Sequence, residues 1–186
     1  MKAGKSVPPT EAATKERSAW LRPGALFFLA ALVLMGLWMA WIIRHNNPGG
    51  NVGKPAPDFT AVTAERKEVK LSEQLGKPLL LVFWMECSGP SKEELAWLAA
   101  QYPALQARGI SVIAVNLDPS FERATEAAKT LHLPYLSLFD TNRTSAYSYN
   151  PVVAPATFFI DREGKVTEFL AGFHDLLKQD ITQWKP

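Results

Sequence analysis

The sequence contains a single cysteine, Cys87, among 186 residues. One thiol cannot close an intramolecular disulfide, and it cannot supply a cysteine-rich zinc site. Soft sulfur ligands suit copper(I), and Met85 and Cys87 lie close together, which leaves a copper site as an alternative. We nevertheless expect no metal and no cofactor, because none of the histidines has the spacing of a metal-binding pair. These histidines are His45, His132 and His174.

The sequence also lacks a strong excess of either charge, since its formal net charge is +2. Up to Arg44 there are six Lys/Arg and two Asp/Glu, whereas the rest of the chain has fourteen and sixteen. Proteins that bind nucleic acid carry basic surfaces on the folded domain itself. A basic N-terminal arm on a nearly neutral body therefore argues against a nucleic-acid partner.

No charge occurs between residues 24 and 43. As a helix this run spans about 30 Å, the thickness of the hydrocarbon core of a bilayer. Five Lys/Arg precede it and one directly follows, which keeps the N-terminus in the cytoplasm by the positive-inside rule. A cleaved signal peptide is the alternative, but its apolar region is shorter and ends at an A-x-A site, which this run lacks. We therefore predict a cytoplasmic arm, residues 1–23, and a transmembrane anchor, residues 24–43.

The chain beyond the anchor divides into a tether and one domain. Residues 44–57 are rich in Asn, Gly and Pro and predict a flexible tether. The domain, residues 52–186, has the usual size of a single domain and shows no internal repeat. Its short apolar runs predict buried strands. These runs are residues 79–84, 110–115, 135–139 and 156–160.

Helical patterns separate these strands. Apolar residues at three- and four-residue steps from Leu95 predict a helix that Pro103 should bend or break near its last turns. Residues 120–131 and 175–184 predict two further helices, and a turn at residues 161–164 predicts a hairpin. Strand–helix–strand units with a terminal hairpin and helix predict an α/β domain, whose mixed sheet is covered on both faces.

Three segments resemble the TlpA/ResA and AhpC/TSA branch of thioredoxin-like proteins. Residues 52–59, VGKPAPDF, resemble its opening G-x-x-A-P-x-F. Tyr147, followed by residues 154–161, APATFFID, resembles Y-G-V…P-T-T-F-x-I-D, although two extra residues separate Tyr147 from Pro155. Residues 83–94, FWMECSGPSKEE, resemble F-W-A-x-W-C-G-P-C-K-x-E. The resemblance implies a thioredoxin-like fold, preceded by one N-terminal transmembrane helix and held outside the cytoplasm.

The third segment departs from the family where its redox chemistry resides. In an alignment without gaps, Ser88 and Ser91 take the positions of the two redox cysteines, and Cys87 takes that of a tryptophan. In active relatives the first cysteine attacks a partner disulfide as a thiolate, and the second resolves the mixed disulfide. A serine hydroxyl cannot form a disulfide. The resemblance therefore implies a redox-degenerate site, in which catalysis by Cys87 alone is the alternative.

The neighbouring polar residues have structural explanations. Ser91 and Glu94 fit the capping box S-x-x-E, so we expect Ser91 to cap a helix and Glu94 to support the cap. Glu94 matches a carboxylate that handles protons in the relatives, and Lys92 matches the lysine of the family motif. No histidine matches a partner position for a catalytic serine.

Pro155 matches the proline that follows a cis peptide bond in the family and faces the active-site helix. In relatives the strand edge at this proline binds an extended peptide through backbone hydrogen bonds. The resemblance implies such a groove here, which requires no cysteine. Its expected residues are Trp84, Cys87, Gly89, Val153, Ala154 and Pro155.

The resemblance thus implies a single-pass protein of the cytoplasmic membrane, with its domain on the periplasmic or extracytoplasmic side. The leading hypothesis is a domain that binds an extracytoplasmic protein or peptide without dithiol exchange. The alternative is a thiol-disulfide oxidoreductase that uses Cys87 and an external thiol. A peroxidase is a third class, and it needs a sulfur nucleophile in another loop.

Overall fold

A computed structural model describes residues 23–45 and 50–185, with the side chains of the first helix described over residues 28–40. The basic arm up to residue 22 and tether residues 46–49 lie outside this description. The chain forms two compact units, Met1–His45 and Asn46–Pro186. In the first unit, the predicted anchor lies within helix α1 (Pro23–His45), whose apolar side chains include the exposed Phe28 and Trp38.

Within the part of the chain that the structure describes, no helix meets the combined length and apolarity that a membrane crossing requires.

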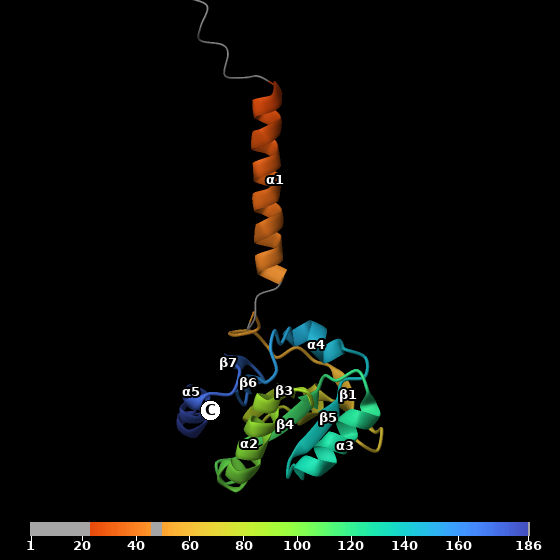
Figure 1. Cartoon of the computed structure of the whole chain (residues 1–186). Helices are drawn as coiled ribbons and strands as arrows, with labels where there is room; N and C mark the ends of the chain where they lie inside the picture. The colour runs from red at the N-terminus through yellow and green to blue at the C-terminus, as the bar shows by residue number, and fades with distance from the viewer. Residues whose placement is uncertain (1–22, 46–49, 186) are drawn as a thin grey trace, which may run out of the picture. The chain divides into compact units, whose positions relative to one another are not determined.

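The second unit is built on one seven-stranded sheet of order β2-β1-β5-β4-β3-β6-β7 (Figure 1). The central strands β3, β4 and β5 are parallel, whereas β6 and β7 run antiparallel to their neighbours. The strands are β1 (Thr60–Val62), β2 (Glu68–Lys70), β3 (Leu79–Trp84), β4 (Ser111–Asn116), β5 (Leu136–Phe139), β6 (Ala156–Ile160) and β7 (Val166–Ala171). This mixed sheet confirms the predicted α/β class.

Helices cover both faces of the sheet. Every residue of β3 and of β6 is buried, as expected for central strands packed on two sides. One face packs against α2, α3 and α5, and the other against α4 and the 3-10 helix η1. The helices are α2 (Gly89–Ala107), α3 (Phe121–Leu131), α4 (Thr144–Tyr149), α5 (Asp175–Gln183) and η1 (Leu71–Gln74).

The four predicted strands, the hairpin and the helices predicted at residues 120–131 and 175–184 are confirmed within one or two residues. The helix predicted from Leu95 is also present, but it begins six residues earlier, at Gly89. Gly164 takes φ +76° in the predicted hairpin turn. Pro103 was predicted to bend or break α2, and the break is wrong, because α2 continues to Ala107. Proline removes one helical hydrogen bond, but Leu98 and Leu105 are buried on either side and hold both parts against the sheet.

Two short strands and two short helices had not been predicted. β1 and β2 have three residues each, which is too short for an alternating pattern. α4 has six residues between Arg143 and Asn150, both of which take left-handed conformations. Such elements form because they pair with or pack on the central sheet, and their own sequences do not reveal them.

Candidate functional site

Helix α2 begins at the end of β3, directly beside the cis Ala154–Pro155 peptide. Ser88 is its N-cap, and its Oγ accepts the N–H of Ser91 at 3.2 Å. The same hydroxyl donates to the carbonyl of Ala154 at 2.8 Å. The cis proline expected from the resemblance is therefore present, and one serine hydroxyl connects it to the helix start.

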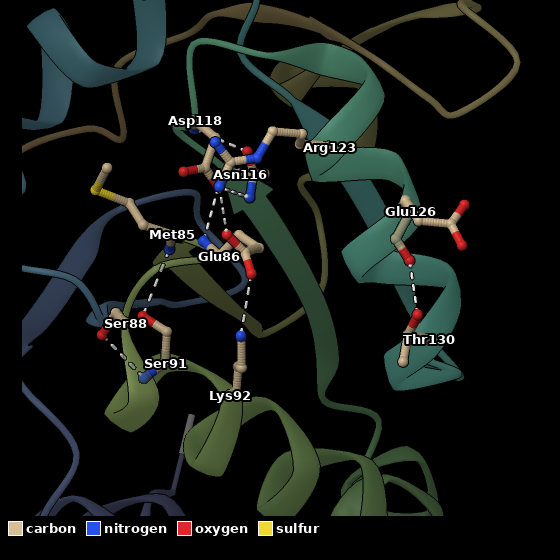
Figure 2. Close-up of polar contacts among 10 residues, drawn as sticks. All are labelled: Met85, Glu86, Ser88, Ser91, Lys92, Asn116, Asp118, Arg123, Glu126 and Thr130. Carbon is tan, nitrogen blue, oxygen red and sulfur yellow. Dashed lines mark hydrogen bonds and ion pairs between the residues drawn. The ribbon is translucent and has the colours of Figure 1, made fainter.

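Ser91 lies inside α2 and is fully buried. Its hydroxyl accepts the N–H of Met85 at 3.4 Å, as Figure 2 shows. The predicted capping box is wrong, since Ser88 caps the helix and Ser91 is the residue whose N–H is capped. The helix starts earlier than expected because Gly89 and Pro90 occupy its first turn, where proline is well accommodated.

Glu94 lies on α2, and its side chain is fully buried in the domain. The hydroxyl of Thr157 on β6 donates to its Oε1, and Oε2 has no hydrogen-bond partner among the described residues. Burial raises the pKa of Glu94 from 4.5 to about 7, although the Thr157 hydrogen bond acts in the opposite direction. The predicted role of Glu94 in the cap is therefore wrong, and this carboxyl is neutral in a large fraction of molecules at neutral pH.

The expected peptide edge is only partly exposed. Val153 is 46% exposed and Ala154 is partly buried, whereas Pro155 is buried. Trp84 is fully buried, and its Nε1 has no partner among the described residues. The inclusion of Trp84 in a peptide groove is therefore wrong, because the tryptophan is the last residue of β3 and packs in the core with Leu95.

Cys87 lies in the turn between β3 and α2, and its thiol is free and exposed. β3 ends at Trp84, so Met85 and Cys87 do not share one face of a strand. In residues 23–45 and 50–185, the structure shows no group of three side chains that could hold a metal ion. Cys87 also precedes the N-cap, so Ser88 takes the position that faces both the helix N–H groups and Ala154.

Glu86, Lys92 and Arg123 form an ionic cluster beside the start of α2 (Figure 2). The carboxylate of Glu86 contacts Lys92 at 3.2 Å and Arg123 at 3.0 Å. Hydrogen bonds from these two cations, Lys92 first, lower the pKa of Glu86. The backbone N–H of Glu86 donates to Oδ2 of Asp118 at 2.7 Å.

Sequence reasoning identified Lys92 in this cluster and missed its other members. Glu86 and Arg123 are 37 residues apart, and no motif connects them. The side-chain amide of Asn116 donates a hydrogen bond to the same Oδ2 of Asp118 at 2.8 Å. The polar pair N-x-D directly after a buried strand was the one signal that could have pointed to this end of the sheet.

The two tyrosines of α4 differ in burial. Tyr147 is 82% exposed, whereas Tyr149 is buried and donates its hydroxyl to the carbonyl of Pro57 at 2.9 Å. Tyr149 packs against Phe83 and Phe158, with ring centroids 5.3 and 5.0 Å apart. Tyr149 also lies two residues nearer to Pro155 than Tyr147 does, which equals the number of extra residues noted in the family resemblance.

Comparison with known proteins shows the family of this chain. The AhpC/TSA family profile matches residues 52–169. Thiol-disulfide oxidoreductase ResA of Bacillus subtilis is 28% identical over 158 residues, which cover 85% of this chain and 87% of the relative. ResA of Geobacillus thermodenitrificans is 30% identical over 132 residues, which cover 71% of this chain and 75% of the relative.

Solved structures show the same fold. A protein of Chlorobium tepidum, described as a thiol:disulfide interchange protein DsbE, superposes with a TM-score of 0.65 and 30% identity. The match covers 69% of this chain and 91% of that one. The chain therefore belongs to the AhpC/TSA family, as a thioredoxin-like protein of the ResA/TlpA type.

Proposed function

We propose that this chain is a membrane-anchored, extracytoplasmic member of the family that does not exchange disulfides and instead holds an extended segment of a partner protein. The observation that carries the proposal is the hydrogen bond from Ser88 Oγ to the carbonyl of Ala154 at 2.8 Å. It places a hydroxyl at the helix start, facing the cis-proline segment.

The chemistry of oxygen supports the loss of redox activity. Thiol-disulfide exchange requires a thiolate that attacks a disulfide sulfur, so that one S–S bond forms as another breaks. Ser88 and Ser91 have no sulfur, and both hydroxyls take part in hydrogen bonds that shape the helix start. The site therefore retains the shape of an oxidoreductase site and lacks its electron exchange.

The strand edge at Ala154 supports binding. The exposed side chain of Val153 precedes Ala154 directly, at the place where family members pair with an extended peptide. Backbone hydrogen bonds supply affinity in such pairing, and they require no reactive side chain. A partner segment added at this edge would contact Val153 and pass the start of α2.

The N-terminal sequence supports the anchor. Residues 24–43 carry no charge, and their described apolar side chains find no protein partner within the first unit. Lys/Arg gather before this segment, which supports a cytoplasmic N-terminus and an extracytoplasmic domain. Alkaline carbonate extraction tests this part: the full chain should stay with membranes, and a chain that starts at residue 46 should be released.

An insulin-reduction assay with glutathione or dithiothreitol tests the redox part. We expect the full chain to match the uncatalysed rate, and Cys87→Ala to change nothing. In the Cys87→Ala background, Ser88→Cys with Ser91→Cys should generate reductase activity, because the helix start and the cis proline are in place. Turnover by the natural chain that disappears in Cys87→Ala would establish the one-thiol oxidoreductase instead.

Photo-cross-linking tests the binding part. A photoreactive side chain at position 153 should capture an extracytoplasmic protein in intact membranes, with or without Cys87. The matched control is position 176 on α5, since Leu176 is also exposed and apolar. Equal capture at both positions would show that the Ala154 edge has no specific role.

A further inference from the structure

A groove of about 370 Å³ lies between α2 and α3, next to the start of α2. Its volume falls within the range of sites that bind small ligands or single side chains of a partner. Ala127 and Leu131 of α3 provide an apolar floor, and Thr130 lies beside them. Neither the two serines nor Ala154 lines this groove.

One wall of the groove holds two cations that share a single carboxylate. Lys92 and Arg123 each contact a different oxygen of Glu86. The three side chains together carry a charge of +1, and both cations have further N–H donors beyond the one that each gives to Glu86. Lys92 and Arg123 keep 44% and 75% of their side-chain surface exposed, so they can reach a ligand.

Glu86 is held in place from the opposite side. Its backbone N–H donates to Oδ2 of Asp118. The side-chain amide of Asn116 donates to the same oxygen of Asp118. These bonds hold the backbone of Glu86, from which its side chain reaches both Lys92 and Arg123. Arg123 offers planar donors of the kind that match a carboxylate.

Glu126 of α3 also lines the groove and carries a negative charge. Figure 2 shows its carboxylate turned away from Glu86, Lys92 and Arg123. An anion is therefore attracted to the Lys92–Arg123 pair, whereas Glu126, one turn after Arg123 on α3, disfavours a second negative charge beside the apolar floor. The apolar floor occupies the remaining lining, so an acidic group followed by an aliphatic group matches the groove in order.

We propose that this groove binds a partner segment in which an acidic side chain is followed by aliphatic side chains. The inference rests on the proposed function, because it names the chemistry of the partner. The two sites flank the same helix start: Ser88 contacts Ala154, and Lys92 contacts Glu86 (Figure 2), which in turn contacts Arg123 of α3. A partner held at the Ala154 edge thus has its neighbouring residues within reach of the groove.

The test uses the full chain in detergent micelles, with backbone amide shifts recorded by NMR. The probe is a pentapeptide with one glutamate followed by two leucines, blocked at both ends, and its twin carries glutamine instead. We expect shifts at Ala127, Thr130 and Leu131, and binding of the glutamate peptide about tenfold tighter than that of its twin. Higher ionic strength should reduce the difference.

Arg123→Gln and Lys92→Gln should each remove most of the preference for glutamate. The matched control is Arg66→Gln, which removes an exposed ion pair to Glu122 on the same helix α3 and should keep the preference. Equal binding of both peptides, or an equal effect of Arg66→Gln and Arg123→Gln, would overturn the proposal. Amide shifts at Val153, Ala154 and Ala156 report the edge separately, so a failure of the proposed function is distinguishable from a failure of the groove.

Discussion

The hydroxyl of Thr157 on β6 donates a hydrogen bond of 2.5 Å to Oε1 of Glu94 on α2, across 63 residues of sequence. Together with the bond from Ser88 to Ala154, it connects α2 to the segment that contains the cis proline. One connection lies at the start of the helix and the other lies in the buried core. The geometry around Ser88 and Glu94 therefore depends on hydrogen bonds between oxygens.

Glu94 should make the stability of the domain depend on pH. Its folded-state pKa of about 7 lies above the ordinary value of 4.5, so its contribution is fully present below pH 4.5 and is lost as the pH rises through 7. Glu94→Gln mimics the neutral acid. Between pH 5 and pH 8, we expect this variant to gain about 2–3 kcal/mol of unfolding free energy relative to the natural chain. Urea unfolding at several pH values measures this gain.

The matched control is Glu163→Gln, because Glu163 is exposed in the hairpin turn. A constant difference between Glu94→Gln and the natural chain across the pH range would contradict the raised pKa.

Thr157→Val should remove the one hydrogen bond to Glu94 while keeping the shape of the side chain. Loss of a buried donor leaves Oε1 unpaired, which costs about 1–3 kcal/mol of stability. The pKa of Glu94 should rise further, since the Thr157 hydrogen bond lowers it. Thr157→Ser keeps the hydroxyl and should keep the pKa, so NMR titration of the Glu94 carboxyl in both variants distinguishes the hydrogen bond from packing.

Ser88→Ala should cost more than the loss of a helix cap. Ser120 caps α3 through the N–H of Arg123 at 3.3 Å and provides the matched control. Loss of either cap costs about 1 kcal/mol, whereas Ser88→Ala also loses the bond to Ala154, worth about 1 kcal/mol more. Chemical unfolding of both variants measures the difference, and equal losses would show that the Ala154 bond contributes nothing to stability.

The two tyrosines of α4 should respond oppositely to truncation. Tyr149→Ala removes a buried ring from the core and should cost about 3–5 kcal/mol. Tyr147→Ala changes an exposed residue and should stay within about 0.5 kcal/mol of the natural chain. Thermal unfolding of both variants tests which tyrosine is the family position, and a large loss from Tyr147→Ala would restore the first match.

Several features followed from the sequence because they depend on local pattern. The apolar run of β3 predicted a strand buried on both faces, and the spacing around Pro155 predicted a cis peptide from the family resemblance. The family resemblance also predicted, without any structure, that Ser88 and Ser91 take the positions of the two redox cysteines. A sulfur atom that is absent from the covalent chain cannot be supplied by folding.

The tertiary structure decided what each of these residues contacts. The S-x-x-E pattern suited a cap at Ser91, yet the fold buries Glu94 against Thr157 and makes Ser88 the cap. The register of β3 with β6 sets these contacts across more than sixty residues, and α3 brings Arg123 to Glu86 in the same way. Short patterns cannot contain this information, because the distances are fixed by packing of the whole sheet and its helices.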